Sequence, residues 1–371
     1  MKTNLLLIHD SMTGGGAERV LTTLLHHFDR SRFNITFMLI YREGVFLSSV
    51  PEDIELISLF DRLKTPWQRL ITHFAPIRDF VRRRRAKRLL RGRRFDVTVS
   101  FMEGPVSRLH SQLLDLAPRN ISWVHTTLGA NRWYDFWFKK EDERRFYASV
   151  DRIAFVSTHS MADFKDLFST DARLEVIYNP VDPDIIARSA GDARRDPDAP
   201  FTIITAGRMV PAKCQDRLIR AARILKDHGH TFRVDILGVG PLEAELKALS
   251  AELGTDDCVR FLGFNPNPFP MIQQADVFCL TSMAEGFGMV VAEALSLGTP
   301  VVSTRVAGVP EMLAHGGGIL TGDTPEDIAA ALESLMDNPE TLARVTAETV
   351  ESARQFNVRL IMDQIYRFIT E

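Results

Sequence analysis

Two carboxylates and a glycine turn mark the most distinctive stretch of the chain, residues 281–302, TSMAEGFGMVVAEALSLGTPVV. Glu285 lies just before an apolar helical run, and Glu293 lies inside it, roughly two helical turns further on. Glycines let the backbone approach a ligand closely, and the free N–H groups at a helix start suit phosphate or sugar oxygens. The two carboxylates can therefore face one ligand, or they can be a surface pair on an amphipathic helix.

Apolar runs on both sides of this turn predict the elements that position it. Residues 277–280 read as a buried strand, Gly298 ends the helical run, and residues 301–302 begin another strand. The order is strand, glycine turn, helix and strand, which is half of an α/β nucleotide-binding fold.

Two cations follow another predicted strand, residues 201–206, in the same half of the chain. Arg208 stands in the turn after this strand, and Lys213 stands at the start of the next helix. Cations at a helix start suit the two phosphates of a diphosphate and would make a metal unnecessary. Two surface cations beside an ordinary turn would give the same pattern.

The first half of the chain repeats the order of strand, glycine turn and helix. Gly14, Gly15 and Gly16 follow a predicted strand at residues 5–9, which is a place for phosphate or simply a tight turn. His125 stands at the carboxyl end of a predicted strand at 120–124, where open α/β sheets bind ligands, although a single histidine is often structural.

A dense basic run is the most unusual feature of the first half. Nine of the thirteen residues from 82 to 94 are cations: Arg82, Arg83, Arg84, Arg85, Lys87, Arg88, Arg91, Arg93 and Arg94. Apolar residues precede them: Trp67, Leu70, Ile71, Phe74, Ile77, Phe80 and Val81. This pattern favours a helix that rests on an anionic membrane surface, with a solvated helix face as the alternative. No nucleic-acid reader motif accompanies the run, so we expect no nucleic-acid partner.

Length and composition set the remaining bounds. A chain of 371 residues is too long for one ordinary core, so two domains are expected. The net charge of −3 combines +7 over residues 1–180 with −10 over the rest, which favours an anionic partner for the first half. Apolar runs are too short for a membrane span, no signal peptide is expected, and three isolated cysteines predict reduced cytosolic thiols.

The motif EGFG…EA…GTPVV, with seven residues between Glu285 and Glu293, closely resembles the signature of glycosyltransferase family 4. The resemblance covers the carboxyl-terminal half well and the amino-terminal half more loosely. It implies the GT-B fold, in which two Rossmann-like doubly wound α/β domains face each other across a cleft. We expect an acceptor-binding domain at 1–185, a nucleotide-sugar-binding domain at 200–355, and a last helix at 356–371 that returns to the first domain.

The resemblance also implies retaining transfer of a hexose or N-acetylhexosamine from a nucleotide sugar, with UDP as the expected nucleotide. Arg208 and Lys213 would stabilise the leaving diphosphate, Glu285 would bind sugar hydroxyls, and Glu293 would bind the ribose. His125 would touch the donor sugar near the reacting region, and no metal or cofactor is expected. Further contacts to the nucleotide sugar are expected from Gly15, Gly16, Phe264, Gly286, Phe287, Gly288 and Met289. The family often has glycine after the lysine, so Cys214 puts the tightness of that turn in question.

The loop GGGAER, together with the basic run, resembles bacterial enzymes that extend polyprenyl-diphosphate-linked glycans. It implies a lipid-linked acceptor and a cytoplasmic protein attached to the inner face of the membrane, and the aromatic segment 133–138 is either an acceptor wall or interdomain packing. A soluble acceptor, a non-catalytic subunit and a GT-B phosphorylase remain alternatives. A nicotinamide-dependent oxidoreductase is another alternative. The dinucleotide-binding fingerprint, however, would need a third glycine after Gly238 and Gly240, and Glu243 occupies that position.

Overall fold

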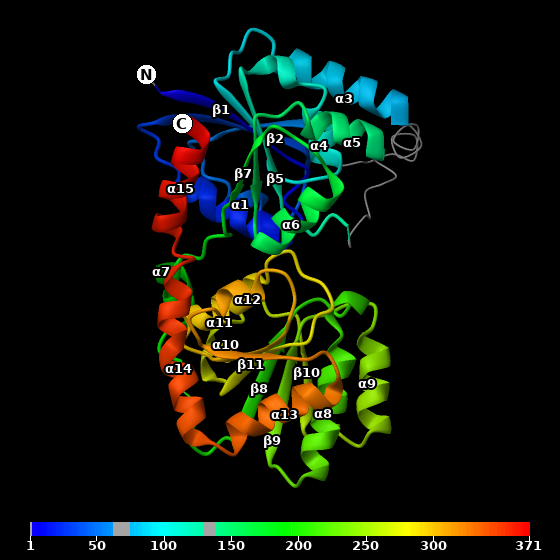
Figure 1. The fold of residues 1–371 in the computed structure, drawn as a ribbon, viewed down its shortest axis with the longest axis vertical. Coiled ribbons are helices and arrows are strands. Elements are labelled where there is room, and N and C mark those ends of the chain that lie inside the picture. The colour runs from blue at the N-terminus through cyan, green and yellow to red at the C-terminus, as the bar shows by residue number, and fades with distance from the viewer. Residues whose placement is uncertain (1, 62–74, 130–137, 194) are drawn as a thin grey trace. The chain divides into compact units, whose positions relative to one another are not determined.

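The computed structural model describes residues 2–61, 75–129, 138–193 and 195–371 (Figure 1). The chain divides into two compact units. The first consists of Met1–Pro180 together with Val358–Glu371, and the second of Val181–Asn357. Each unit is a parallel β-sheet covered by helices, so the predicted α/β class with two doubly wound sheets is confirmed.

Seven parallel strands form the sheet of the first unit, in the order β3-β2-β1-β4-β5-β6-β7. Their bounds are β1 (Thr3–His9), β2 (Phe33–Arg42), β3 (Glu55–Asp61), β4 (Val97–Ser100), β5 (Arg119–Val124), β6 (Arg152–Phe155) and β7 (Arg173–Val176). The chain builds outward from β1 to β3 and then returns to β4 on the other side of β1. The carboxyl ends of β1 and β4 therefore form the topological switch point of this sheet, where open α/β folds bind ligands.

Helices cover both faces of this first sheet, because successive strand residues point to opposite sides. Leu6 and Ile8 pack with Ala86 and Leu90 on the side of α3 and α4. The helices and short 3₁₀ turns of the unit are α1 (Gly16–His27), η1 (Leu47–Ser49), α3 (Ala75–Leu89), α4 (Pro105–His110), η2 (Leu114–Leu116), α5 (Lys140–Tyr147), α6 (Thr158–Leu167) and α15 (Val358–Thr370).

The last helix, α15, belongs to the first unit and packs beside α1. Its apolar face is buried, and the ring of Tyr366 stacks on Phe33 at 5.3 Å. The hydroxyl of Tyr366 donates to the carbonyl of His27 at 2.9 Å and accepts from the N–H of Asp29 at 2.8 Å. The guanidinium of Arg119 donates to the carbonyl of Ile369 at 2.6 Å, so both apolar and polar contacts hold the helix in place.

Six parallel strands form the sheet of the second unit, in the order β10-β9-β8-β11-β12-β13. Their bounds are β8 (Phe201–Ala206), β9 (Phe232–Leu237), β10 (Val259–Gly263), β11 (Val277–Leu280), β12 (Val301–Thr304) and β13 (Gly318–Thr321). Here the order reverses between β8 and β11. The carboxyl ends of those two strands form the second switch point.

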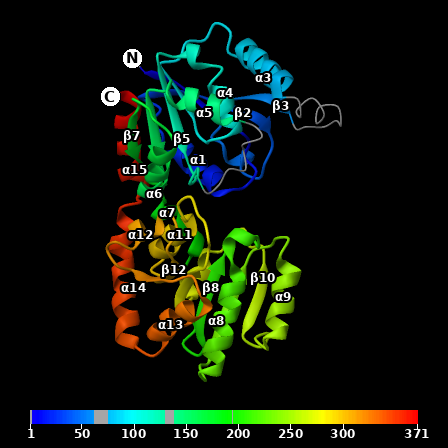
Figure 2. The ribbon, with the colours of Figure 1, turned by 45° about the vertical axis from the view of Figure 1, so that its right-hand side comes forward.

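Helices α8 and α13 lie side by side against one face of the second sheet, as both views show (Figures 1 and 2). Leu218 and Ile219 of α8 share a core with Ile328 and Leu332 of α13. The unit contains α7 (Pro183–Ala190), η3 (Pro211–Lys213), α8 (Gln215–Asp227), α9 (Glu243–Glu252), α10 (Phe269–Gln274), α11 (Met289–Ser296), α12 (Val309–Met312), α13 (Pro325–Met336) and α14 (Pro339–Arg354).

Two predicted features fall partly outside the described residues. They are the apolar stripe at Trp67, Leu70, Ile71 and Phe74, and the aromatic segment 133–138 up to residue 137. The last residue of that segment, Phe138, is buried and packs on Phe146 at 6.0 Å. Within the described parts of the chain, no helix is both long and apolar enough to cross a membrane.

Candidate active site

The loop after β8 carries the two predicted cations, Arg208 and Lys213. It closes through η3 and a single residue, Cys214, before α8 begins. Cys214 has φ 46° and ψ 44°, and it is the only described residue other than glycine with a positive φ. The turn after Lys213 is therefore tight even without a glycine. Cys214 adopts the left-handed conformation that glycine adopts more easily.

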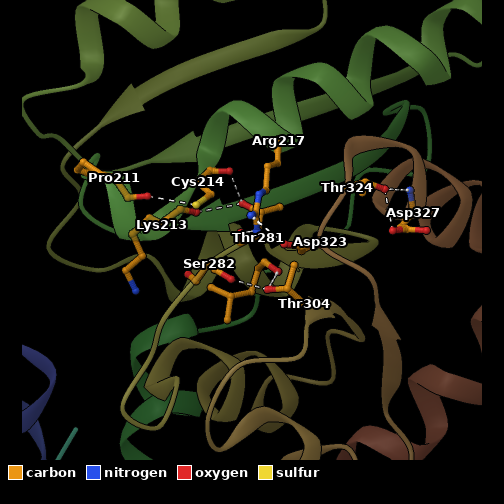
Figure 3. Close-up of polar contacts among 11 residues, drawn as sticks. Pro211, Lys213, Cys214, Arg217, Thr281, Ser282, Thr304, Asp323, Thr324 and Asp327 are labelled. Atoms are coloured by element: carbon orange, nitrogen blue, oxygen red, sulfur yellow. Dashed lines mark hydrogen bonds and ion pairs between the residues drawn. The ribbon is translucent and has the colours of Figure 1, made fainter. Parts of the chain in front are cut away.

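Hydrogen bonds join this loop to the turn after β11 (Figure 3). The hydroxyl of Thr281 donates to the carbonyls of Lys213 and Cys214, at 3.1 and 2.9 Å. The N–H of Met283 donates to the carbonyl of Ala212 at 2.8 Å. The two loops at the second switch point are thus fixed to each other before any ligand binds.

Lys213 and Glu285, which the sequence assigns to different parts of one ligand, contact each other. The Nζ of Lys213 lies 2.5 Å from Oε1 of Glu285, and the hydroxyl of Ser282 donates to the same oxygen at 2.6 Å. The side chains of Lys213 and Glu285 are 23% and 12% exposed, so the ion pair is largely shielded from water. A diphosphate that bound Lys213 would have to compete with this carboxylate.

Side chains that the sequence analysis did not single out hold this arrangement (Figure 3). The hydroxyl of Thr304, at the end of β12, donates to the carbonyl of Ser282 at 2.7 Å. The guanidinium of Arg217 lies 3.1 Å from the carboxylate of Asp323, which precedes α13, and 3.4 Å from the carbonyl of Thr281. The only sequence signal for Thr281 and Ser282 is their place directly after a buried strand, where polar side chains meet ligands or neighbouring loops.

Helix α11 begins directly after Gly288, whose φ of 87° is a left-handed conformation. Phe287 is buried, and its ring meets Phe356 edge-on at 5.5 Å. A Cβ on Gly308 would lie 2.3 Å from the carbonyl oxygen of Phe287, so this glycine permits the close approach of the two loops. Glu293 is only 3% exposed within α11, unlike a surface carboxylate.

Gly238 and Gly240 allow the backbone after β9 to pack closely against the backbone after β8. A Cβ on Gly238 would lie 1.9 Å from the carbonyl oxygen of Gly207, and one on Gly240 would lie 2.3 Å from that of Met209. These glycines bring the loop after β9 against the loop that carries Arg208. Phe264 follows β10, two strands away from β8, and its side chain is 72% exposed.

The first switch point has a different character, because its polar groups are buried. The N–H of His125 donates to Oε2 of Glu103 at 2.9 Å, and the imidazole packs on Phe101 at 4.6 Å. Burial lowers the pKa of His125 to about 3 and raises the pKa of Glu103. No role for Glu103 was predicted from the sequence, although it lies three residues after the end of β4.

His9 and Asp10, at the end of β1, extend this buried group. Burial lowers the pKa of His9 to about 4. Burial also raises the pKa of Asp10 to about 6, against the opposing charge of Arg82. The imidazoles are therefore neutral near pH 7, whereas Asp10 is still mostly ionised there beside the charge of Arg82.

The glycine loop after β1, residues 14–16, is in contact with the carboxylate of Glu18. Gly15 caps α1, and Gly16 is the first residue of that helix. A Cβ on Gly15 would lie 2.4 Å from Oε2 of Glu18, and the hydroxyl of Thr13 donates to Oε1 of Glu18 at 3.3 Å. The carboxylate of Glu18 thus stands near the helix start, where the sequence analysis expected a ligand anion.

The nine cations of the basic run, residues 82–94, differ in how far they are exposed. Arg82 is buried and donates to the hydroxyl of Tyr41 at 2.8 Å. Lys87 lies 2.6 Å from the carboxylate of Asp115, and Arg93 forms a two-pronged ion pair with Glu55. The other cations of the run are exposed: Arg83, Arg84, Arg85, Arg88, Arg91 and Arg94.

Two family models match consecutive parts of the chain. Residues 14–185 match the model described as Glycosyltransferase Family 4, and residues 192–351 match the model described as Glycosyl transferases group 1. The first match falls in the first unit except for its last five residues, and the second match falls in the second unit.

Curated relatives resemble parts of this chain. The amylovoran biosynthesis glycosyltransferase AmsK of Erwinia amylovora is 36% identical over 146 residues, covering 37% of this chain and 35% of that protein. The D-inositol 3-phosphate glycosyltransferase of Corynebacterium glutamicum (strain R) is 30% identical over 235 residues, covering 58% of this chain and 56% of that protein. This chain thus spans about half the length, or less, of these curated relatives.

Solved structures resemble the whole chain. Anabaena HepE, determined with UDP and glucose, superposes with a TM-score of 0.77 over 99% of both chains at 20% sequence identity. At this level of identity the likeness establishes a shared two-domain α/β fold.

Proposed function

The chain belongs to glycosyltransferase family 4, and from this we propose that it transfers a sugar from a nucleotide sugar to a growing polysaccharide. The function of AmsK in amylovoran biosynthesis supports a polysaccharide acceptor. The UDP and glucose bound to HepE support a uridine diphosphate sugar as donor substrate, with a hexose or N-acetylhexosamine as the transferred group.

The observation that carries the proposal is the contact of Lys213, Glu285 and Ser282 at the second switch point. The carboxylate of Glu285 lies 2.5 Å from Nζ of Lys213 and neutralises its charge. When the nucleotide sugar binds, the ammonium of Lys213 turns to the diphosphate, and the carboxylate of Glu285 accepts hydrogen bonds from sugar hydroxyls. The resting ion pair thereby keeps both groups in place without leaving a shielded charge uncompensated.

Arg208 and Lys213 then stabilise the charge that develops on the leaving diphosphate. Cations fixed before the reaction act strongly because no reorganisation is needed when the bond breaks. We propose that these cations supply the counter-charge in place of a metal, and that attack occurs with retention of configuration. The buried Glu293 binds the ribose hydroxyls.

His125 acts in its neutral form. Its low pKa keeps the imidazole uncharged near pH 7, so that it exchanges hydrogen bonds with sugar hydroxyls as a neutral group. Glu103 fixes the backbone of His125 through their 2.9 Å hydrogen bond and acts as a positioning residue.

The transfer reaction is tested with a panel of nucleotide sugars and oligosaccharide acceptors, with products identified by mass spectrometry. One donor should yield a product of the same anomeric configuration, and Lys213→Ala should abolish that product. Lys247→Ala is the matched control, because Lys247 forms an ordinary surface ion pair with Glu243 at 2.8 Å. Hydride transfer to or from NADH in place of sugar transfer, or full activity of Lys213→Ala, contradicts the proposal.

We further propose that α3 attaches the protein to an anionic membrane surface, where a lipid-linked acceptor would lie. Ile77 and Phe80 are 51% and 62% exposed, and helical spacing places Arg84 and Arg88 on the same face of α3, with the exposed Arg91 in the turn that follows the helix. Exposed apolar side chains at one end and arginines at the other suit insertion beside phosphate headgroups.

Vesicle flotation tests this attachment, with a variant that spares the buried Arg82. Wild type should float with anionic vesicles at low salt and detach at high salt, because the attraction is screened. The test variant replaces four exposed cations by serine: Arg83, Arg84, Arg88 and Arg91. The control makes the same change in net charge at exposed positions elsewhere: Arg144, Arg145, Arg344 and Arg354. Equal flotation of both variants would show that the basic run is only a solvated face.

A further inference from the structure

Four side chains with metal-ligating atoms gather where α8 and α13 end, at the opposite end of those helices from the candidate active site. His228 directly follows α8, and His230 stands in the turn before β9. Glu333 lies in the last turn of α13, and Asp337 caps that helix. The elements are neighbours because α8 and α13 pack side by side (Figures 1 and 2).

Two imidazoles meet one carboxylate oxygen, and the second ring nitrogen of His230 faces Asp337. Nδ1 of His228 and Nε2 of His230 lie 2.9 and 2.8 Å from the same oxygen, Oε1 of Glu333. Nδ1 of His230 lies 3.8 Å from Oδ1 of Asp337. One ligand atom each from His230, Glu333 and Asp337 lie within 4.8 Å of one another, a spacing short enough for the ligands of a single metal ion.

Donor chemistry selects the class of ion. Imidazole nitrogens together with carboxylate oxygens suit Zn²⁺ and its transition-metal neighbours, whereas Mg²⁺ and Ca²⁺ prefer oxygen ligands alone. The side chains of His230 and Glu333 are 17% and 28% exposed, which leaves them shielded but reachable from solvent. A carboxylate beside the second ring nitrogen of a ligating histidine orients the imidazole ring. Asp337 lies on that side of His230.

We propose that His228, His230, Glu333 and Asp337 form a structural Zn²⁺ site. The metal joins the carboxyl-terminal ends of α8 and α13. At their other ends these helices are joined by Arg217 and Asp323, and α8 begins directly after the loop that carries Lys213. Bound Zn²⁺ therefore stiffens the helix pair that supports this loop, and it takes no part in chemistry on a substrate.

Zinc binding is measured on the full chain without a histidine tag, by competition with a chromophoric zinc indicator and by thermal unfolding with Zn²⁺ or Mg²⁺. The test variants are His230→Asn and Glu333→Gln. The control is His159→Asn, because His159 is an exposed histidine on α6 in the first unit. Two further variants, His228→Asn and Asp337→Asn, change the more exposed positions and leave His230 and Glu333 intact.

We expect one equivalent of Zn²⁺ per chain, a higher unfolding temperature with Zn²⁺, and no effect of Mg²⁺. His230→Asn and Glu333→Gln should each weaken Zn²⁺ binding by at least about tenfold, and the two exposed variants by less, while His159→Asn binds like wild type. Absence of saturable binding below roughly 100 µM would overturn the proposal and leave an ion-pair cluster. Equal binding by wild type, His230→Asn and Glu333→Gln would also overturn it and point to other histidines or thiols. Circular dichroism of the metal-free variants shows whether a loss of binding reflects unfolding.

Discussion

The two switch points of the molecule have the same topology and opposite electrostatics. At the ends of β8 and β11, charged groups are present and paired, as in the contact between Lys213 and Glu285. At the ends of β1, β4 and β5, burial shifts titratable groups toward their neutral forms, as the pKa of about 3 for His125, which follows β5, illustrates. Parallel strands bring loops together at the same place in both units, but the degree of burial decides whether the resulting site is charged or neutral.

This difference suits two kinds of ligand. At the charged site, a diphosphate can replace Glu285 as the partner of Lys213. The free-energy cost is small, because the lysine is already largely removed from water. A site of neutral imidazoles and carboxyls that burial has shifted toward protonation suits the hydroxyls of a sugar, each of which donates and accepts a hydrogen bond. This comparison supports the proposal that the second unit binds the diphosphate and the first unit binds sugar hydroxyls.

The largest expected effect lies at the charged site. Arg208→Ala or Lys213→Ala should lower kcat by about 10²–10³-fold, the usual consequence of removing one preorganised group that stabilises developing charge. Steady-state kinetics with the identified nucleotide sugar measure the effect, and Lys247→Ala should retain wild-type values. If His125→Gln cost far more than either cation variant, the neutral site would dominate catalysis and the comparison would be reversed.

The neutral site should reveal itself in the pH dependence of stability. Unfolded His125 takes up a proton near pH 6.5, whereas the folded imidazole resists protonation down to about pH 3. The free energy of unfolding should therefore fall as the pH drops below 6.5, and His125 contributes about 1.4 kcal/mol per pH unit to that slope. Asp10 opposes the trend between pH 6 and 3.8, because its pKa is raised in the folded chain.

Comparing wild type with His125→Gln isolates this contribution from that of Asp10. Urea unfolding at several pH values between 4 and 7 should give a shallower slope for the variant. Parallel curves for the two proteins would mean that folding leaves the pKa of His125 unchanged, which contradicts the depressed pKa of the buried imidazole.

The smallest expected effect concerns the strained turn beside Lys213. Cys214→Gly should raise the free energy of unfolding by about 0.5 kcal/mol, since relief of the left-handed strain slightly exceeds the added flexibility of the unfolded chain. Cys258→Gly is the control, because Cys258 has a negative φ and packs against the core, so it should be destabilising. A loss of stability in both variants would mean that the turn stores no strain.

The sequence was sufficient for features that depend on local pattern. Buried apolar runs and glycine turns predicted many of the strands and helices, because strand and helix periods and turn chemistry are local properties. That these elements form two doubly wound sheets was implied by the family resemblance. The motif around Glu285 indicated the family, which the family models confirm. The roles predicted for Glu285, Glu293, Arg208 and Lys213 at a nucleotide sugar stay predictions.

Features that depend on long-range contact could not be predicted from the sequence. Arg82 and Arg83 are adjacent and identical in type, yet only Arg82 is buried, against Tyr41, forty-one positions away. Glu103 reaches His125 across twenty-two positions through the sheet. The left-handed φ of Cys214 and the pairing of Lys213 with Glu285 arise from loop packing, for which the sequence has no periodic signal.

The central claim is that Glu285 holds Lys213 until a diphosphate replaces it, and calorimetric titration with UDP tests it most directly. UDP lacks the sugar that Glu285 would bind, so Glu285→Gln removes only the competing carboxylate. The variant should bind UDP about threefold to tenfold more tightly than wild type, while its turnover with the nucleotide sugar falls. Weaker binding of UDP by Glu285→Gln would contradict the claim, because Glu285 would then support the diphosphate and not compete with it.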